Sequence, residues 1–509
     1  MFQNNLLMAA ASNASGGATV ITSVGNSALF DSTNSESLTR AFGTPDSTTK
    51  GTFRTILGLA GGLGSYRVIF GAGTAGTDFM NIRLDASDNL QIIGYVSNTL
   101  IINKITSMRF RDVLSFYDIV CRFDSTNATA SSRFILEVNG VTITDFSTDT
   151  GLTLNSRIWL AENLTSRIGR HGGTDLHYGN FYLAETSWLD NNLEPASSFG
   201  EFDTTGLYWT PKSSTVIKAL TFGTNGFYLD NTTNAQTDAS GEGNNFTNNN
   251  TVTTSTHTPT NLDVLLNPLA SAFSTPVVLS NGNTNITNSG SQWRVVPATV
   301  GMLSGKYYWE IQISGSGTYS MVGIATASYS TTAGYTGFPL AVTSTTKGAY
   351  MLARDGYKYS GAGGRQAYTT TWASGDRLGV AFDADNGFVY VSKNGTWYAS
   401  SDPTSGATGT GAMFGSLTDL PYYPASHIYT GYSHQYYFKE DDWSASAPTG
   451  YSAVQNSTAL AEATTRTASD TNKYFQTVLY EGNGAGQRVG AFQPFDNTFT
   501  VGNSALFNS

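Results

Sequence analysis

The sequence contains one cysteine, Cys121, so the chain cannot form an internal disulfide. Packed cores and subunit association must then supply its stability, which is typical of proteins assembled in a cytoplasm. Cys121 belongs to an alternating apolar pattern with Tyr117, Ile119 and Phe123, which predicts a β-strand with a buried thiol. No histidine lies near it in the sequence to lower its pKa, so we interpret Cys121 as a structural residue and not as a nucleophile.

Charged residues are also scarce. Asp, Glu, Lys and Arg make up 13% of the chain, about half of the usual share, and the formal net charge is −10. Nucleic acids and anionic lipids are bound through clustered Lys and Arg, so this balance argues against both as partners. The sequence has no apolar run of 18 residues, and no segment is predicted to enter a membrane. The first residues lack the basic start of a secretory signal, and we expect them to belong to the mature protein.

Glycine and aromatic residues are abundant instead: the 509 residues include 54 glycines, and 12% are Phe, Trp or Tyr. This composition favours strands and turns over helices, and the length suits two or more domains. The clearest hairpin is Arg-Phe-Ile-Leu-Glu-Val at 133–138, then Asn139-Gly140, then Val-Thr-Ile-Thr at 141–144, because Asn-Gly favours a type I′ turn. We therefore predict an all-β protein. The family resemblances of the next two stretches of sequence imply that it consists of two antiparallel β-sandwiches.

Residues 17–215 show short strand patterns at regular spacing. A hydrophobic stretch at 115–123 precedes the Asn-Gly hairpin, and Arg-Ile-Gly at 167–169 and Gly-Asn-Phe-Tyr-Leu-Ala-Glu at 179–185 follow it. This order resembles the laminin G-like and concanavalin A-like jelly rolls. The resemblance implies that this region is a jelly-roll sandwich.

Residues 269–447 carry a second set of motifs. Gly-Lys-Tyr-Tyr-Trp-Glu-Ile at 305–311 is followed by Val-Gly-Ile at 322–324, Gly-Asp-Arg-Leu-Gly-Val-Ala-Phe-Asp at 375–383 and Lys-Asn-Gly-Thr-Trp at 393–397. These parts and their order resemble the SPRY family. The resemblance implies a β-sandwich that binds partners and is not an enzyme, with binding loops at one end near residues 335–339, 357–365 and 397–402.

The remaining segments are polar. Residues 216–268 are predicted to form a polar connector, pinned to domain surfaces by Phe227, Tyr228 and Phe246. The order of residues in this connector resembles that of connectors in bacteriophage virion proteins. Residues 448–509 are predicted to be a short C-terminal β segment with a hairpin at 473–484.

A seven-residue repeat joins the two ends of the chain. Val-Gly-Asn-Ser-Ala-Leu-Phe occurs at residues 24–30 and again at 501–507. The second copy is either the relic of a duplicated module or an edge strand that can occupy the slot of the first copy in its own or a neighbouring subunit.

Catalytic and metal-binding patterns are weak. Glu-Phe-Asp-Thr-Thr-Gly at 201–206 holds two acids of a glycosidase-like Glu-x-Asp-x-x-Glu pattern, but Gly206 stands where the second glutamate is needed. The five histidines lack the spacing of a zinc site, and we interpret the Gly-rich stretch from His171 to His177 as a surface loop tip. We predict no catalytic residues and no cofactor, with calcium left open through loop aspartates. Those aspartates are Asp78, Asp85 and Asp88, or Asp383 and Asp385.

Aromatic residues are the best candidates for a binding surface, because amphipathic rings stack on sugars and anchor protein interfaces. The alternative is that about half of them fill the sandwich core. The candidate glycan or partner residues are Tyr335, Tyr357, Tyr359, Arg365, Trp372, Trp397, Tyr422 and Tyr423. The apolar Leu6, Leu7 and Met8 within residues 1–16 are predicted to dock the protein on a particle, on one face of a short helix.

Together these features resemble a bacteriophage virion appendage of the tail fibre, tail spike or capsid fibre class. The resemblance implies a non-enzymatic, homo-oligomeric structural protein, a trimer by analogy with such fibres, that is assembled in the host cytoplasm. Its partners would be other virion proteins and a host-surface glycan. The first alternative is a virion decoration or collar protein with protein contacts only, and the second is a polysaccharide depolymerase.

Overall fold

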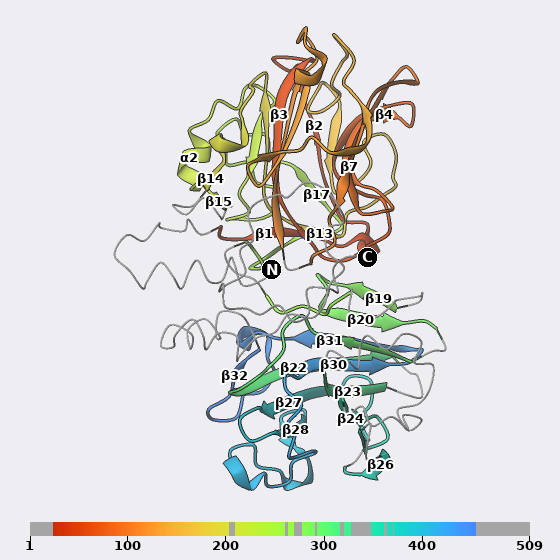
Figure 1. The fold of residues 1–509 in the computed structure, drawn as a ribbon, viewed down its shortest axis with the longest axis vertical. Coiled ribbons are helices and arrows are strands. Elements are labelled where there is room, and N and C mark those ends of the chain that lie inside the picture. The colour runs from red at the N-terminus through yellow and green to blue at the C-terminus, as the bar shows by residue number, and fades with distance from the viewer. Residues whose placement is uncertain are drawn as a thin grey trace. The chain divides into compact units, whose positions relative to one another are not determined.

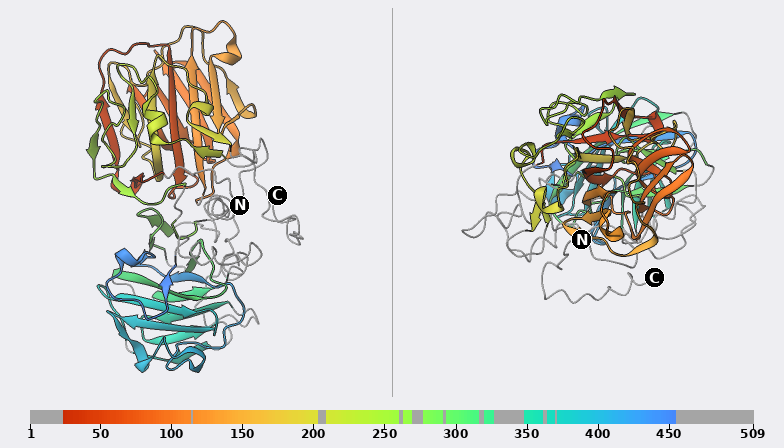
Figure 2. Two further views of the ribbon diagram at one scale, coloured as in Figure 1. Left: turned by 90° about the vertical axis from the view of Figure 1, so that its left-hand side faces the viewer. Right: turned by 90° about the horizontal axis from the view of Figure 1, so that it is seen from above.

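A computed structural model describes residues 24–454, apart from 114, 203–208, 260–262, 269–276, 291–292, 316–319, 327–347, 361–363 and 370. The chain divides into two units, the first ending at Leu262 and the second running from Asp263. Each unit is a set of packed β-sheets (Figures 1 and 2). None of the described helices is both long and apolar enough to cross a membrane.

The first unit is built on two eight-stranded antiparallel sheets. In spatial order, sheet I contains β10 (Val141–Thr142), β9 (Phe134–Val138), β8 (Phe116–Asp124), β3 (Lys50–Leu59), β13 (Phe181–Asp190), β1 (Ser27–Phe30) and β18 (Thr253–Ser255), and β16 (Phe227–Leu229) also pairs with β13. Sheet II contains β11 (Phe146–Thr150), β7 (Thr99–Arg109), β6 (Asn89–Val96), β5 (Asp78–Leu84), β4 (Arg67–Ala75), β12 (Thr165–Ile168), β2 (Ser37–Ala41) and β17 (Thr247–Asn249). A ribbon of β14 (Gly200–Phe202) and β15 (Trp209–Pro211), the helix α2 (Ser214–Lys218) and the 3₁₀ turns η1 (Ser32–Asn34), η2 (Ala130–Ser132) and η3 (Ala196–Ser198) complete the described elements.

The core of this unit lies between the two sheets. Phe53 of β3 stacks on Phe70 of β4 with ring centroids 5.1 Å apart, and both rings are fully buried. Phe70 pairs in register with Ile82 of β5, so these side chains share the inner face of sheet II. Because side chains alternate along a strand, Asn81 and Arg83 of β5 point to the outer face, away from sheet I.

Two local predictions are confirmed. Asn139 and Gly140 join β9 to β10 with φ angles of 49° and 74°, which is the positive-φ pair that a type I′ turn requires. Cys121 lies on β8 with none of its surface exposed, and burial raises the pKa of its thiol.

Residues 216–262 differ from the predicted connector. They supply three strands to the first unit: β16 pairs with β13, β17 with β2 and β18 with β1. Phe227 of β16 has none of its surface exposed and packs on Phe246, 4.9 Å between centroids. Edge strands are held by backbone pairing and by a few buried rings, so a polar segment can belong to a sheet without the alternating apolar pattern that would reveal it.

The outer face of sheet I is covered by the segment from η3 to β16. Arg54 of β3 is fully buried there and forms ion pairs with Asp118, at 2.8 Å, and with Glu185. The cover completes this network, because Trp209 donates to Asp118 at 3.0 Å and Tyr228 donates to Glu185 at 2.8 Å. The cover also buries apolar side chains, including those of Phe199, Ile217 and Phe222.

The second unit is also a sandwich. Sheet III contains, in order, β19 (Val277–Ser280), β20 (Asn285–Asn288), β31 (Tyr432–Tyr437), β22 (Lys306–Gly315), β27 (Arg377–Asp383), β28 (Phe388–Lys393) and β29 (Thr396–Trp397), and β32 (Ser452–Ala453) runs parallel to β22. Sheet IV contains β21 (Arg294–Pro297), β30 (Tyr423–Ile428), β23 (Ser320–Ala325), β24 (Ala349–Ala353), β25 (Tyr357–Ser360) and β26 (Gly364–Ala367). The 3₁₀ turns are η5 (Tyr398–Ser400), η6 (Gly406–Thr408) and η7 (Glu440–Asp442).

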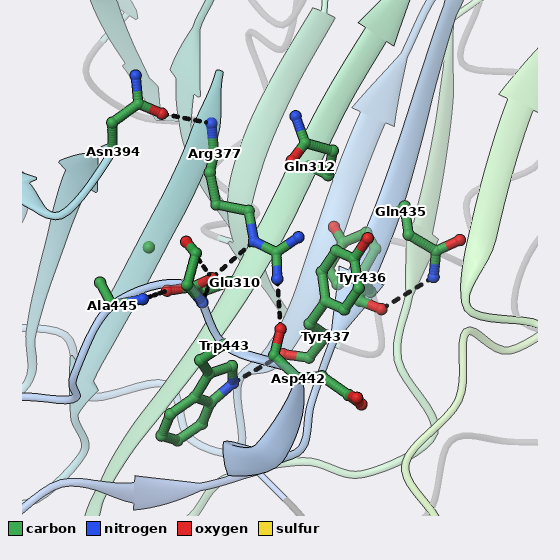
Figure 3. A network of polar contacts seen from close by, with 12 residues as sticks. Glu310, Gln312, Arg377, Asn394, Gln435, Tyr436, Tyr437, Asp442, Trp443 and Ala445 are labelled. Carbon is green, nitrogen blue, oxygen red and sulfur yellow. Dashed lines mark hydrogen bonds and ion pairs between the residues drawn. The ribbon is translucent and has the colours of Figure 1, made fainter. Parts of the chain in front are cut away.

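Strand β22 shows how the two faces of sheet III are used. Trp309 and Ile311 join the buried core between the sheets, whereas Tyr308 and Glu310 face outward. The segment around η7 covers this outer face (Figure 3). Glu310 accepts hydrogen bonds from Arg377 Nε at 2.6 Å and from the backbone N–H groups of Ser444 and Ala445 at 2.7 and 2.9 Å.

The structure agrees with the predicted fold class and with several of the predicted local elements. The all-β class with antiparallel sandwiches is confirmed, and Asn394-Gly395 within the Lys-Asn-Gly-Thr-Trp motif joins β28 to β29 as a hairpin. The first copy of the repeat forms β1, between β13 and β18. The second copy, the hairpin at 473–484 and the docking segment 1–16 lie outside the described residues.

Phe227→Ala tests whether the former connector belongs to the first unit. We expect a loss of about 3–5 kcal/mol in the free energy of unfolding, because a buried ring leaves a cavity. Urea unfolding of the full chain, followed by tryptophan fluorescence, measures it. Phe202→Ala, which removes a ring that is 38% exposed, is the control and should cost less than about 1 kcal/mol. Equal losses for the two variants would contradict this assignment.

Glu310→Gln tests the cover of sheet III. Burial alone would raise the pKa of Glu310, but hydrogen bonds from Ser444, Arg377 and Ala445 outweigh it and lower the pKa. The carboxylate therefore stabilises the cover above its unfolded pKa, near 4.3, and this stability is lost as the pH falls through the lower folded value.

We expect limited proteolysis to cut the natural protein near residues 440–450 only at acidic pH. Glu310→Gln should be cut there at pH 7 as well, because loss of the charge leaves Arg377 without its buried carboxylate partner at a cost of about 3–5 kcal/mol. Protection of Glu310→Gln equal to that of the natural protein at pH 7 would refute the role of Glu310.

Candidate functional site

Four of the predicted binding residues are core residues. Tyr359 and Trp372 are 1% exposed, Tyr422 is 0% exposed and Tyr423 is 1% exposed. Tyr422 packs edge-on against Phe382, 5.7 Å between centroids, and Trp372 packs against Tyr432. Trp372 and Tyr422 lie in the core between the sheets, whereas Tyr359 belongs to a separate buried cluster with Met321 and Met351. All four rings are buried, as the alternative interpretation allowed for about half of the candidates, and they cannot contact a ligand at the surface.

Trp397 is partly buried under the cover of sheet III. Its ring lies edge-on to Tyr308, 6.2 Å between centroids, and belongs to the apolar cluster that also contains Trp443. Figure 3 shows Trp443 beside Tyr437 and Asp442 in the covering segment. Trp397 is thus a packing residue of this cover, and not part of an open binding loop.

Tyr357 and Arg365 remain at the surface of the second unit. They lie on the paired strands β25 and β26, where Tyr357 is opposite Ala367 and Arg365 is opposite Tyr359. The Arg365 guanidinium lies 3.6 Å from the centre of the Tyr357 ring. Arg365 also pairs with Asp355 at 3.0 Å, and the two side chains are 45% and 40% exposed. Exposed ion pairs contribute little to stability, so this group is available for a partner. Tyr335 and the docking residues Leu6, Leu7 and Met8 lie outside the described residues.

A second group of polar and aromatic residues lies on the outer face of sheet II in the first unit. The strand register places Tyr95 of β6 opposite Phe79 of β5, and Gln91 opposite Arg83. Arg83 Nε donates to Gln91 Oε1 at 2.8 Å, and Gln91 donates in turn to Asn103 of β7. A band of hydrogen-bonding side chains therefore crosses three neighbouring strands.

The loop after β12 lies on this face. Its backbone is close to β4: a Cβ atom on Gly172 would lie 2.5 Å from the Ala72 nitrogen, and one on Gly173 would lie 2.1 Å from the Ala75 oxygen. The Gly172 N–H donates to Asn81 Oδ1 at 2.9 Å. Only glycine permits this approach, so the Gly-Gly pair brings the histidines on either side of it onto the sheet.

Six residues form a continuous row there, which we call the outer-face cluster. Neighbouring groups lie 4.4–5.8 Å apart, measured between ring centroids or from Arg83 Cζ to the Tyr66 ring. Tyr66 is 40% exposed, and His171 is 5% exposed. In order, the row contains Arg83, Tyr66, His177, His171, Phe79 and Tyr95.

The cluster is rich in basic groups. Burial, together with charge repulsion from the nearby His177, Arg83 and Arg167, lowers the pKa of His171 to about 4. Burial and Arg83 likewise lower the pKa of His177. The Gly173 N–H donates to His171 Nδ1 at 3.0 Å, so the neutral imidazole of His171 carries its proton on Nε2.

Sequence reasoning missed this cluster. It interpreted the stretch from His171 to His177 as a loop tip at the surface, whereas His171 is buried against Phe79. Residues near positions 66, 83, 95 and 171–177 meet only because of the strand register. The Gly172-Gly173 pair was the one local signal, since glycines beside a strand can mark a close backbone approach.

At the other predicted sites, the described residues do not form a catalytic pair of acids or a set of metal ligands. Glu201 is an exposed residue of β14, and Asp203 lies outside the described part of the chain. Asp88 is bound by Arg67 and Arg111, and Asp383 by Lys306. Within the described ranges no group of three or more His, Cys, Asp or Glu residues is placed to hold a metal ion.

Comparison with known proteins finds a family match within the second unit. Residues 306–440 match the family model of the SPRY domain. A search of curated proteins found no match. Among solved structures, the chain is similar to the SPRY domain of human HERC1, with 20% identity over 31% of this chain and 91% of that chain and a TM-score of 0.23.

Two other solved structures are similar to parts of the chain at lower identity. A human SPRY domain is 16% identical, over 32% of this chain and 95% of that chain, with a TM-score of 0.22. A protein of Bacteroides ovatus that is proposed to bind carbohydrate is 16% identical, over 45% of this chain and 59% of that chain, with a TM-score of 0.31. Residues 306–440 of the second unit thus match the SPRY domain, and both units are built of antiparallel β-sheets.

Proposed function

We propose that the protein is a structural protein of the bacteriophage virion, a fibre-like or spike-like appendage that attaches to glycan on the host surface. The observation that carries the glycan part is the outer-face cluster. It sets the partly exposed ring of Tyr66 beside the guanidinium of Arg83 and the imidazole of His177. A sugar ring presents an apolar face and polar edges, and amphipathic rings beside hydrogen-bonding groups suit both.

The virion part rests on the sequence. The single cysteine, the few charges and the connector-like order of residues 226–261 resemble phage virion proteins. In this proposal the chain is assembled in the host cytoplasm, forms a homo-oligomer, a trimer as in comparable fibres, and docks through Leu6, Leu7 and Met8. A sheet face with one partly exposed ring would bind weakly, and several copies on one particle would raise the effective affinity by avidity.

A second candidate is a virion decoration protein that contacts only other virion proteins. The group of Tyr357, Arg365 and Asp355 favours it, because exposed Tyr and Arg are typical anchors of protein interfaces. These residues lie at the β25–β26 edge of sheet IV, where β26 has one unpaired side among the described strands.

Binding to a panel of bacterial surface polysaccharides tests the proposed function. Tyr66→Ala should weaken binding roughly tenfold, as expected for loss of a stacked ring worth about 1–1.5 kcal/mol. Phe202→Ala is the matched control, because it removes a ring of similar exposure on the β14–β15 ribbon of the same unit. Binding that Tyr66→Ala and Phe202→Ala leave equally strong would exclude the outer-face cluster as the glycan site.

The position of the chain in an electron cryomicroscopy map of the virion separates the two candidates. If the outer face of sheet II points to solvent at the end of an appendage, attachment stands. If virion neighbours enclose both units, the decoration role replaces it.

A further inference from the structure

We propose that the ligand of the outer-face cluster is an acidic glycan whose carboxylate binds beside Arg83. This inference deepens the proposed function and rests on it. It commits to a charged sugar, such as a uronic or sialic acid, in a protein whose formal charge of −10 would suggest the opposite preference.

The argument begins with the partners of the buried arginines. Three described arginines of the first unit are less than a tenth exposed: Arg54, Arg67 and Arg83. Arg54 lies 2.8 Å from Asp118, and Arg67 lies 2.5 Å from Asp88. A buried guanidinium normally has such a carboxylate, because removing a charge from water is costly without a partner.

Arg83 is the exception. No carboxylate of the described residues forms an ion pair with it, and its hydrogen bond to Gln91 uses only Nε. Its cation lies over the Tyr66 ring at 4.4 Å, which orients the side chain without neutralising it. The two terminal nitrogens of Arg83, the end that binds a carboxylate with two parallel hydrogen bonds, therefore keep their donors available.

The surroundings strengthen the positive charge. Arg167 of β12 and Arg170 of the loop are close enough to repel each other, and Arg167 and Arg83 both act on His171. The acidic groups that face this region are Asp85, whose carboxylate accepts from the backbone of Ser87 and Asn89, and Asp175, which pairs with Arg170 and is 74% exposed. Basic groups therefore exceed acidic groups on this face.

Several buried donors among the described residues of this face also have no hydrogen-bond partner. Nε of Arg167, Nε of Arg170 and Nδ2 of Asn81 are buried donors without a hydrogen-bond partner. Such groups each carry a free-energy cost, and all three are donors. A bound anion would offset the charge of this region, whereas a neutral sugar would leave it unchanged.

The histidines add a pH dependence with a defined sign. His171 and His177 are neutral at pH 7, because burial and the neighbouring arginines lower both pKa values. A carboxylate bound among them would raise these values, so binding would be coupled to proton uptake. Affinity for an acidic ligand should therefore rise as the pH falls from 8 to 5.

The test uses the full chain and pairs of oligosaccharides that differ only in charge. Each uronate- or sialate-bearing oligosaccharide is compared with its methyl ester, which keeps the sugar and removes the charge. We expect the acid to bind roughly tenfold to a hundredfold more tightly than its ester, as calorimetry would measure, since hydrogen bonds to a charged group contribute about 1.5–3 kcal/mol.

Variants locate the effect. Arg83→Gln should abolish the preference for the acid, and Arg83→Lys should keep part of it, which separates loss of charge from loss of folding. Arg133→Gln, which removes the same charge beside β9 of sheet I, is the control and should keep the full preference. Equal affinity for acid and ester, or a preference that survives Arg83→Gln, would overturn the inference.

A second measurement distinguishes failure of this inference from failure of the proposed function. The chain has five histidines, so their ring proton signals can be followed by NMR while free galacturonate is added. If no oligosaccharide binds but galacturonate shifts the His171 and His177 signals, the anion site is supported and the glycan function is refuted. If oligosaccharides bind but galacturonate moves neither signal, the glycan function stands and the anion site falls. If neither ligand binds, both fall.

Discussion

The structure depends on how the outer faces of its sheets are closed. A sandwich buries one face of each sheet against the other and leaves two outer faces. In the first unit Arg54 holds a covering segment on sheet I through Asp118 and Glu185. In the second unit Glu310 holds another on sheet III through Arg377 and two backbone N–H groups. Each cover is tied to its sheet at buried, ion-paired side chains that alternation along their strands turns outward.

These buried charges fix the position of each covering segment on its sheet and add little to the free energy of folding. Removing a carboxylate or guanidinium from water costs several kcal/mol, which its partner must repay, so the net gain is small. An apolar cover could slide along the sheet with little change in energy. A cover that must bring Trp209 and Tyr228 to two particular carboxylates has one register. Because this segment covers the outer face of sheet I, described polar groups of the first unit that lack a charged partner lie on the outer face of sheet II.

The sequence was informative wherever the determining residues are neighbours in the chain. The Asn-Gly turns, the strand that buries Cys121 and the SPRY motifs are all local patterns, and the structure or the family match agrees with them. Burial of single rings was less predictable: Tyr422 and Tyr357 look alike in sequence, yet one packs on Phe382 and the other stays at the surface with Arg365. The strands β16 to β18 and the outer-face cluster are set by register between distant segments, which a single sequence does not record.

The charge of the outer-face cluster also bears on which acidic ligands it could accept. At physiological ionic strength, the electrostatic field of a charge decays over about 8 Å. A polyanion that approaches the protein is therefore repelled by its net negative charge, whereas a carboxylate that is already bound is attracted by Arg83. Attraction is then confined to the last few ångströms, after most of the contact has formed. A dense polyanion would be repelled by the surrounding surface, and a neutral sugar would gain nothing from the guanidinium. A face of this kind therefore selects isolated acidic groups on an otherwise neutral glycan, by local pairing rather than by long-range steering.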